Sequence, residues 1–417
     1  MQRGNRTRRA FLKLSSMAAL GLVSGWPRAK GSVAAPRQAG GRPAAGAGLV
    51  TLFLCGDVML GRGVDQVLPH PGDPRIHDRR THSALTFVEL AERAHGPIPR
   101  PVEPSYVWGD ALEELARVRP DVRIVNLETA VTRSDDRAPK EIHYRMHPEN
   151  IACLTAAGID CCALANNHVL DYGPAGLAET LETLQKANVR SAGAGRNRAH
   201  AEAPAILALP GGRRVIVLAF GSVTAGIPRD WAASEDGPGV NLLEEKEVSE
   251  IAASVRRVKQ PGDVVVASLH WGGNWGYEIP SAQRALARVL LDGAGVDVIH
   301  GHSSHHPKGI EVHGGKPILY GCGDFLNDYE GIEGHEEFRK GLVLMYFVTL
   351  DPASRKLVRL EMTPLRIERF RLERASAADA RWLRDTLDRA GAELGTRVQL
   401  DADDRLTLGW GSLDTAG

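Results

Sequence analysis

Five short apolar runs in this chain of 417 residues each end in polar side chains that can bind metal ions. The runs span residues 49–55, 122–125, 159–165, 264–269 and 296–299; the polar segments after them are Gly56-Asp57, Asn126-Leu127-Glu128, Asn166-Asn167-His168, His270-Trp271-Gly272 and Gly301-His302-Ser303-Ser304-His305. Runs of this length, rich in β-branched residues, are typical of buried strands. Helical patterns lie between them, at residues 111–118, 148–157, 174–187, 243–258 and 281–291. This alternation predicts an α/β protein.

The order of these elements also predicts where the polar segments lie. Strands joined by right-handed helical crossovers run parallel, so their carboxyl ends share one edge of a sheet, where α/β proteins bind their ligands. We therefore expect a single cluster that contains Asp57, Glu128, Asn167, His168, His270, His302 and His305. Such a site is assembled by the fold, because its members span most of the chain.

Three further strand pairs argue against an all-parallel sheet. Residues 206–209 and 215–220 flank one Gly-Gly turn, and residues 309–312 and 318–320 flank another, so both pairs are typical of hairpins. Residues 341–350 and 357–367 form another plausible antiparallel pair. We therefore expect two packed mixed sheets covered by helices, followed by an amphipathic helix at residues 377–390 and a weak strand pair.

The predicted cluster offers carboxylate, imidazole and amide donors. This mixture suits zinc, manganese or iron, whereas calcium and magnesium favour sites made of oxygen alone. Such an ion lowers the pKa of bound water, and a nearby uncoordinated histidine can protonate a leaving group, which together is hydrolytic chemistry. Arg62 follows the Asp57 turn and is a candidate to bind an anionic substrate oxygen, with a surface ion pair as the alternative.

Each of these segments also has a purely structural interpretation. A Gly-Asp pair often stabilises a tight turn, a histidine at a strand end can be a core residue, and residues 300–306 could be an exposed His-rich loop. The expected convergence of several such groups favours a functional site over these separate explanations.

The first residues resemble a targeting signal. Thr7-Arg8-Arg9-Ala10-Phe11-Leu12-Lys13 precedes an apolar stretch at residues 14–25 that is too short to span a bilayer, which resembles a twin-arginine export signal. We divide the chain into a signal peptide (1–35), a flexible Gly/Ala/Pro-rich linker (36–48), a main domain (49–370) and a C-terminal helical extension packed on it (371–417). We expect a periplasmic or extracytoplasmic protein that stays anchored to the membrane if the signal is not cleaved.

Charge and cysteine content exclude several classes of protein. Lys plus Arg and Asp plus Glu both number 51, so no overall basic field attracts nucleic acid, and we expect no nucleic-acid partner. The five cysteines contain no CxxC pair, so neither a zinc ribbon nor a disulfide framework is indicated.

Taken in order, six motifs resemble the CapA family of poly-γ-glutamate capsule synthesis proteins. They are Gly56-Asp57-x-x-x-Gly61-Arg62, Asn126-Leu127-Glu128, Asn166-Asn167-His168, His270-Trp271-Gly272, Gly301-His302-x-x-His305 and Pro317-Ile318-Leu319-Tyr320-Gly321-x-Gly323-Asp324-Phe325. The family's fold is similar to that of calcineurin-like metallophosphoesterases, which implies a four-layer sandwich of two mixed β-sheets flanked by helices. The resemblance implies one or two divalent metal ions bound by Asp57, Glu128, Asn167, His270, His302 and His305. It further implies His168 as the catalytic acid. Arg62 and Asn166 are the candidate substrate-binding residues.

Two functions agree with this resemblance. The first is an exported metal-dependent hydrolase, similar to phosphoesterases, that acts on a phosphorylated small molecule or an anionic polymer such as poly-γ-glutamate beside the capsule-synthesis machinery at the membrane. The second is a non-catalytic binding or export accessory protein for such a polymer. His168 favours the hydrolase, whereas Met59 favours the accessory protein, because it stands where metallophosphoesterases carry a ligand histidine.

Overall fold

The computed structural model describes residues 48–78 and 81–411, so the twin-arginine segment lies outside the described residues. The strands are β1 (Val50–Val58), β2 (Val122–Leu127), β3 (Ala130–Val131), β4 (Arg145–Met146), β5 (Cys161–Ala163), β6 (Arg190–Ala192), β7 (Ala194–Gly195), β8 (Ala205–Ala208), β9 (Arg214–Gly221), β10 (Gly239–Val240), β11 (Val264–His270), β12 (Val298–His302), β13 (Ile310–His313), β14 (Lys316–Leu319), β15 (Asp324–Leu326), β16 (Leu342–Asp351), β17 (Lys356–Glu368), β18 (Arg371–Arg374), β19 (Thr396–Leu400) and β20 (Leu406–Trp410). The α-helices are α1 (Arg62–Asp65), α2 (Leu85–His95), α3 (Ala111–Val118), α4 (Ala152–Ala156), α5 (Gly173–Lys186), α6 (Arg198–Glu202), α7 (Val248–Val258), α8 (Ser281–Gly293) and α9 (Ala377–Gly391). Within these described ranges, no helix combines the length and the apolar character needed to cross a membrane.

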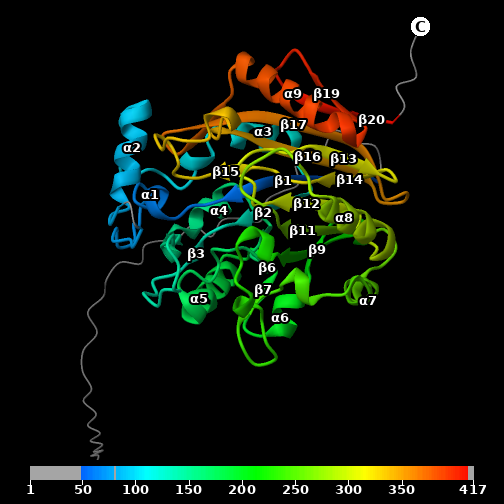
Figure 1. Cartoon of the computed structure of the whole chain (residues 1–417), viewed down its shortest axis with the longest axis horizontal. Coiled ribbons are helices and arrows are strands. Elements are labelled where there is room, and N and C mark those ends of the chain that lie inside the picture. Colours follow the sequence, from blue (N-terminus) through cyan, green and yellow to red (C-terminus); the bar gives the residue numbers. More distant parts are fainter. Residues whose placement is uncertain (1–47, 79–80, 412–417) are drawn as a thin grey trace, which may run out of the picture. The chain divides into compact units, whose positions relative to one another are not determined.

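Two mixed sheets flanked by helices form the centre of the fold, as expected (Figure 1). The larger sheet has the order β19-β20-β17-β16-β1-β2-β5-β6, with β15 beside β1 and β18 beside β17, and the smaller sheet has the order β13-β14-β12-β11-β9-β8. The strands β1, β2, β5 and β6 run parallel, as do β9, β11, β12 and β14. The three predicted antiparallel pairs are confirmed as β8–β9, β13–β14 and β16–β17.

One expectation about topology is wrong: the five strands that carry the predicted site do not share a single sheet. β1, β2 and β5 belong to the larger sheet, and β11 and β12 belong to the smaller one. The crossover rule predicts parallel neighbours, but it does not say which sheet each strand joins.

The alternation of side chains along each strand explains how the two sheets still build one site. Val264 on β11 packs in the core shared with the larger sheet, whereas Val265 packs with α7 and α8 on the outer face. His270 lies six residues after Val264 on β11, and His302 lies four residues after Val298 on β12, which also packs in the shared core. Because residues an even number apart share a face of a strand, each histidine lies on the same face as that valine. Both histidines therefore face the larger sheet.

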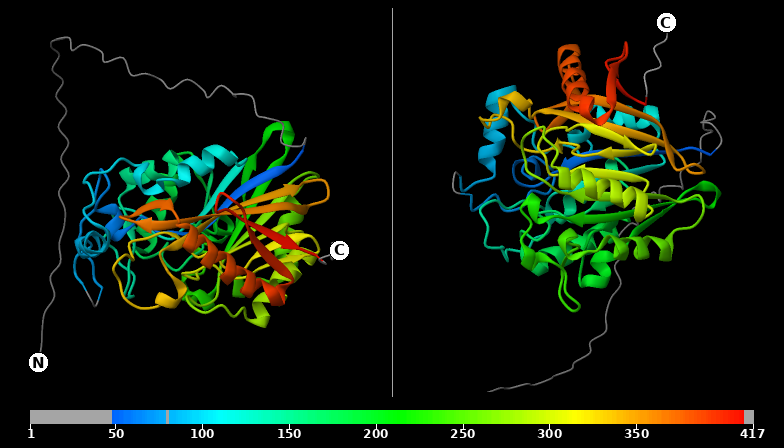
Figure 2. Two further views of the ribbon diagram at one scale, coloured as in Figure 1. Left: turned by 90° about the horizontal axis from the view of Figure 1, so that it is seen from above. Right: turned by 45° about the vertical axis from the view of Figure 1, so that its right-hand side comes forward.

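Helices lie outside both sheets (Figures 1 and 2). The helices α7 and α8 bury Ile251, Val255 and Leu290 against the outer face of the smaller sheet. The described part of the C-terminal region contains the predicted helix, α9, and the predicted strand pair, β19–β20. β18 and β20 also pair with β17, so this region adds strands to the larger sheet.

The end of β1 departs from its regular ladder, and this departure turns polar groups toward the smaller sheet. Pairing with β16 stops at Leu54, and the register with β2 shifts between Leu54 and Asp57. The Asp57 N–H instead donates to the Gly323 carbonyl at 3.0 Å. A Cβ on Gly56 would lie 1.6 Å from the Gly323 oxygen, so this close approach requires glycine.

Candidate metal centre

Three of the predicted ligands meet between the two sheets. Asp57, His270 and His302 come from β1, β11 and β12, and each is 1% exposed. The Nδ1 atoms of His270 and His302 are 2.9 Å apart, and the Asp57 Oδ1 lies 3.9 and 3.8 Å from them. Metal–nitrogen bonds of about 2.0–2.1 Å place tetrahedral donors about 3.3 Å apart. These three atoms could therefore hold one metal ion.

A chain of hydrogen bonds determines which nitrogen of His302 faces this centre. The Cys55 carbonyl can only accept, so the Nε2 of His300 donates to it at 2.7 Å. Burial lowers the pKa of His300 to about 4, so its Nδ1 is unprotonated and accepts from the Ser268 hydroxyl at 3.1 Å. The Ser268 oxygen then accepts from the Nε2 of His302 at 2.9 Å. The Nδ1 of His302 therefore keeps its lone pair, directed at the other two donors.

Buried carboxylates give the centre an excess of negative charge. Burial, followed by repulsion from Asp57 and Asp324, raises the pKa of Glu128 well above its ordinary value. Burial and the charge of Asp324 raise the pKa of Asp57 to about 7. Burial lowers the pKa of His270 and His302 well below the ordinary value, so both rings are neutral ligands. The donor set fits a divalent cation, whose charge would stabilise the ionised forms of Asp57 and Glu128.

Glu128, Asn167 and Asn166 lie on the side of the centre formed by the larger sheet. The Asn167 Oδ1 is 3.0 Å and the Glu128 Oε1 is 3.7 Å from the Nε2 of His270, which is the nitrogen opposite to the one that faces Asp57. The side-chain amide of Asn166 is fully buried and donates to the Leu127 carbonyl at 2.9 Å. The structure thus places Asn166 inside the turn that carries Asn167.

The structure places His305 outside the group of three donors. Its Nδ1 lies 2.9 Å from the Asp324 Oδ1, and its Nε2 lies 3.0 Å from the Asn274 Nδ2. The Asp324 carboxylate raises the pKa of His305 against the opposing effect of burial. Both ring nitrogens of His305 therefore already have partners within the protein.

His168 is held beside the centre by residues that the sequence did not single out. Its Nδ1 lies 2.7 Å from the Asp171 Oδ2, and the Tyr144 ring stacks on it at 3.8 Å. The Lys140 Nζ donates to the other Asp171 oxygen at 2.6 Å. Burial lowers the pKa of His168 to about 4, so the ring is neutral at neutral pH, with its proton on the Asp171 side. The spacing of Asp171, three residues after His168, is the sequence signal that could have identified it.

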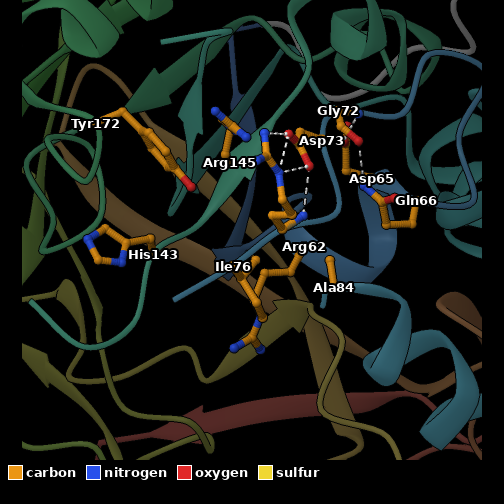
Figure 3. Close-up of a pocket in the computed structure, with 11 residues that line it drawn as sticks. Arg62, Asp65, Gln66, Gly72, Asp73, Ile76, Ala84, His143, Arg145 and Tyr172 are labelled. Atoms are coloured by element: carbon orange, nitrogen blue, oxygen red, sulfur yellow. Dashed lines mark hydrogen bonds and ion pairs between the residues drawn. The ribbon is translucent and has the colours of Figure 1, made fainter. Parts of the chain in front are cut away.

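Arg62 is buried, and its guanidinium is occupied. Its Nε donates to the Asp328 Oδ2 at 3.0 Å, its second nitrogen pairs with the other oxygen, and the Phe87 ring lies 3.8 Å away. The pocket beside Arg62 in Figure 3 has a volume of about 10 Å³, room for about one water molecule. The geometry therefore resembles the ion-pair alternative, although the pair is buried and not at the surface.

Comparison with known proteins identifies the family. Residues 51–329 match the model of the family described as bacterial capsule synthesis protein PGA_cap. The chain belongs to this family. The matched range contains every residue of the candidate metal centre, from Asp57 to Asp324.

The relatives of this PGA_cap-family chain include named proteins from two bacteria. A Mycobacterium tuberculosis protein named "Probable polyglutamine synthesis accessory protein" is 48% identical over 365 residues, which cover 86% of this chain and 96% of that protein. The "PGA biosynthesis protein CapA" of Bacillus subtilis is 29% identical, covering 75% of this chain and 70% of that protein. Among solved structures, a Mycoplasma pneumoniae phosphatase superposes with a TM-score of 0.40 and 12% identity, covering 76% of this chain and 93% of that chain.

Proposed function

We propose that this PGA_cap-family protein is a metal-dependent hydrolase, similar to phosphoesterases, that acts on a phosphorylated or polyanionic substrate in capsule or cell-envelope biosynthesis. The observation that carries the proposal is the convergence of the Asp57, His270 and His302 donor atoms. The family description, bacterial capsule synthesis protein, supports the capsule context. The Mycobacterium tuberculosis relative is named for polyglutamine synthesis and the Bacillus subtilis relative for PGA biosynthesis, and we take poly-γ-glutamate as the polymer.

A zinc, manganese or iron ion held by these three residues would lower the pKa of bound water and polarise a phosphoryl or carbonyl oxygen. The protein's own groups keep the ligands in place. The Asn126 amide donates to the Asp57 Oδ1 at 2.7 Å, and the Ser303 N–H donates to its Oδ2 at 3.2 Å. Glu128 supplies further negative charge that stabilises a cation in the centre.

His168 is the group we propose for proton transfer. In the free protein its Nε2 is unprotonated, because burial holds the pKa of the ring near 4. A bound anionic group stabilises the protonated ring and raises this pKa toward neutrality. Asp171 then stabilises the imidazolium through Nδ1, and Nε2 can donate a proton to a leaving group.

Metal content and hydrolysis of an aryl phosphate, measured on the same samples, test this proposal. We expect His168→Ala to keep the metal and lose turnover, and Asp57→Ala to lose both. His313→Ala is the matched control, because this histidine pairs with Asp292 outside the centre at 2.9 Å. A wild-type protein that takes up no zinc, manganese or iron on reconstitution would contradict the proposal.

Met59 favours a second function, a non-catalytic accessory protein that binds or helps to export an anionic capsule polymer. This buried residue supplies a thioether where metallophosphoesterases have an imidazole ligand. If the protein has this accessory function, we expect it to bind the polymer without turnover. The same hydrolysis assay therefore distinguishes the accessory function from the hydrolase function.

We also propose export by the twin-arginine route, with residues 1–35 as the signal, residues 36–48 as a linker and the capsule-synthesis machinery as a partner outside the cytoplasm. Replacement of both Arg8 and Arg9 by lysine is expected to retain the protein in the cytoplasm. Cell fractionation of wild type and variant checks this, and equal export of both proteins would contradict it.

A further inference from the structure

A groove of about 810 Å³ lies where the edges of the two sheets meet. It is lined by the end of α5, by β6 and by the segment from Arg196 to Ile206, and it contains no residue of the metal centre. β6 is the last strand of the larger sheet and β8 is the last strand of the smaller one, and the two strands contact each other. Figure 1 shows α5, β6 and α6 gathered in the green part of the molecule. The volume lies in the range of ligand-binding sites.

The groove is lined by two arginines, Arg190 and Arg196, and by His200. None of the described residues that line it is an aspartate or a glutamate. In the part of the chain that the structure describes, neither arginine forms an ion pair with a carboxylate within 4.0 Å. Glu182 pairs with Lys186 at 2.7 Å, and Lys186, with a smaller contribution from Arg196, lowers its pKa. The two guanidinium groups therefore keep donors for an external anion.

Several other basic residues already form ion pairs within the protein. Arg214 pairs with Asp263, and Lys259 pairs with Asp297 at 2.8 Å. Since the net charge of the chain is zero, an anionic ligand must be attracted by a local group of unpaired cations, and this groove provides one.

The chemistry of the groove favours an extended polymer that carries carboxylates. Guanidinium groups bind carboxylates through two parallel hydrogen bonds, and Gln185, Asn188 and Ser191 add neutral polar groups. Among the described residues that line the groove there is no phenylalanine, tyrosine or tryptophan, so it lacks the large stacking surfaces that hold the bases of single-stranded nucleic acid.

We propose that this groove binds a segment of an anionic polyamide, poly-γ-glutamate, through Arg190 and Arg196. The identity of the polymer rests on the proposed function, but the binding does not depend on the metal centre. The groove would hold the polymer at a place distinct from the residues that carry out hydrolysis.

Binding of a fluorescent γ-linked decaglutamate to the full-length protein, followed by anisotropy, tests the proposal. We expect Arg190→Gln combined with Arg196→Gln to raise the Kd at least about tenfold and to weaken the dependence of the Kd on salt. Arg397→Gln is the matched control, because Arg397 is an exposed arginine on β19, at the opposite edge of the larger sheet. The Kd of this variant for decaglutamate should stay within about twofold of the wild-type value.

An unchanged Kd in the double variant, with its melting temperature preserved, would overturn the proposal. So would stronger competition by oligothymidylate than by unlabelled decaglutamate. If wild type hydrolyses an aryl phosphate but does not bind decaglutamate, the proposed polymer binding in the groove is contradicted and the proposed hydrolase function is not. The double variant could lose decaglutamate binding while wild type binds no metal and hydrolyses nothing. That result would contradict the proposed hydrolase function and support the proposed binding of the polymer in the groove.

Discussion

Replacement of Ser268 by alanine tests the geometry of the metal centre, because this hydroxyl links His300 to His302. The Ser268 Oγ lies 3.1 Å from one ring and 2.9 Å from the other, and all three residues are buried. Alanine leaves two buried ring nitrogens without partners, each at a cost of about 1–3 kcal/mol. We therefore expect the free energy of unfolding of the metal-free protein to fall by at least about 2 kcal/mol.

A second effect of Ser268→Ala concerns metal affinity. Without the hydroxyl, the proton of His302 is free to move to Nδ1, the nitrogen whose lone pair faces Asp57. Loss of such an outer hydrogen-bond partner typically weakens metal binding by about 10- to 100-fold, or about 1.4–2.7 kcal/mol. Zinc competition with a chromophoric chelator measures this affinity, and urea unfolding with and without zinc measures stability.

Two further variants complete this experiment. Ser249→Ala removes an exposed serine of α7 and should change neither quantity. Ser268→Thr keeps a hydroxyl and should retain most of the zinc affinity. If folded Ser268→Ala binds zinc as tightly as wild type, the hydrogen-bond chain does not orient His302, and the assignment of its proton to Nε2 is refuted.

Three other predictions concern charge. Arg62→Ala leaves Asp328 buried without its counter-charge and should lower the free energy of unfolding by about 3–5 kcal/mol; unchanged stability with a raised KM would instead indicate substrate binding. Relative to Asp57→Asn, the metal-free wild type should lose stability as the pH rises from about 4 to about 7, because Asp57 releases its proton near its ordinary pKa of 3.8 when unfolded but near 7 when folded. The difference between the melting temperatures of the two proteins isolates this effect, because buried histidines such as His168 and His300, whose pKa is lowered to about 4, act with the opposite sign in both proteins. Asp171→Asn should keep the metal but lower turnover at least about tenfold, because the amide no longer stabilises protonated His168; wild-type turnover would argue against this role.

Local sequence patterns are sufficient to predict a helix or strand when the element buries one continuous apolar face. The helices α3 and α8 begin at Ala111 and Ser281, as predicted from their amphipathic patterns. The strand β6 was not predicted, because Arg190-Ser191-Ala192 has no apolar run. It is a strand because β5 supplies its hydrogen-bonding partner, a tertiary effect that local propensity does not contain.

The same distinction applies to the metal centre. The positions of Asp57, His270 and His302 at strand ends were sufficient to predict that they meet. Ser268 and His300 each lie two residues before a ligand on the same strand, so the two-residue period placed them on the same face and could have identified them. The contact of Lys140 with Asp171 depends on the path of a long loop, for which the sequence offers no periodic signal.

The metal centre takes its donors from both sheets, and this affects the order in which the protein can mature. Cys55 and His300, which share a hydrogen bond at the centre, are 245 residues apart in sequence. A nascent or truncated chain that stops before β12 lacks both His300 and His302, and therefore every bond of the hydrogen-bond chain. Metal uptake must therefore be a late event, after both sheets have packed. An ion bound there would act as a cross-link between the sheets, and its removal would weaken the contact between the two halves of the core.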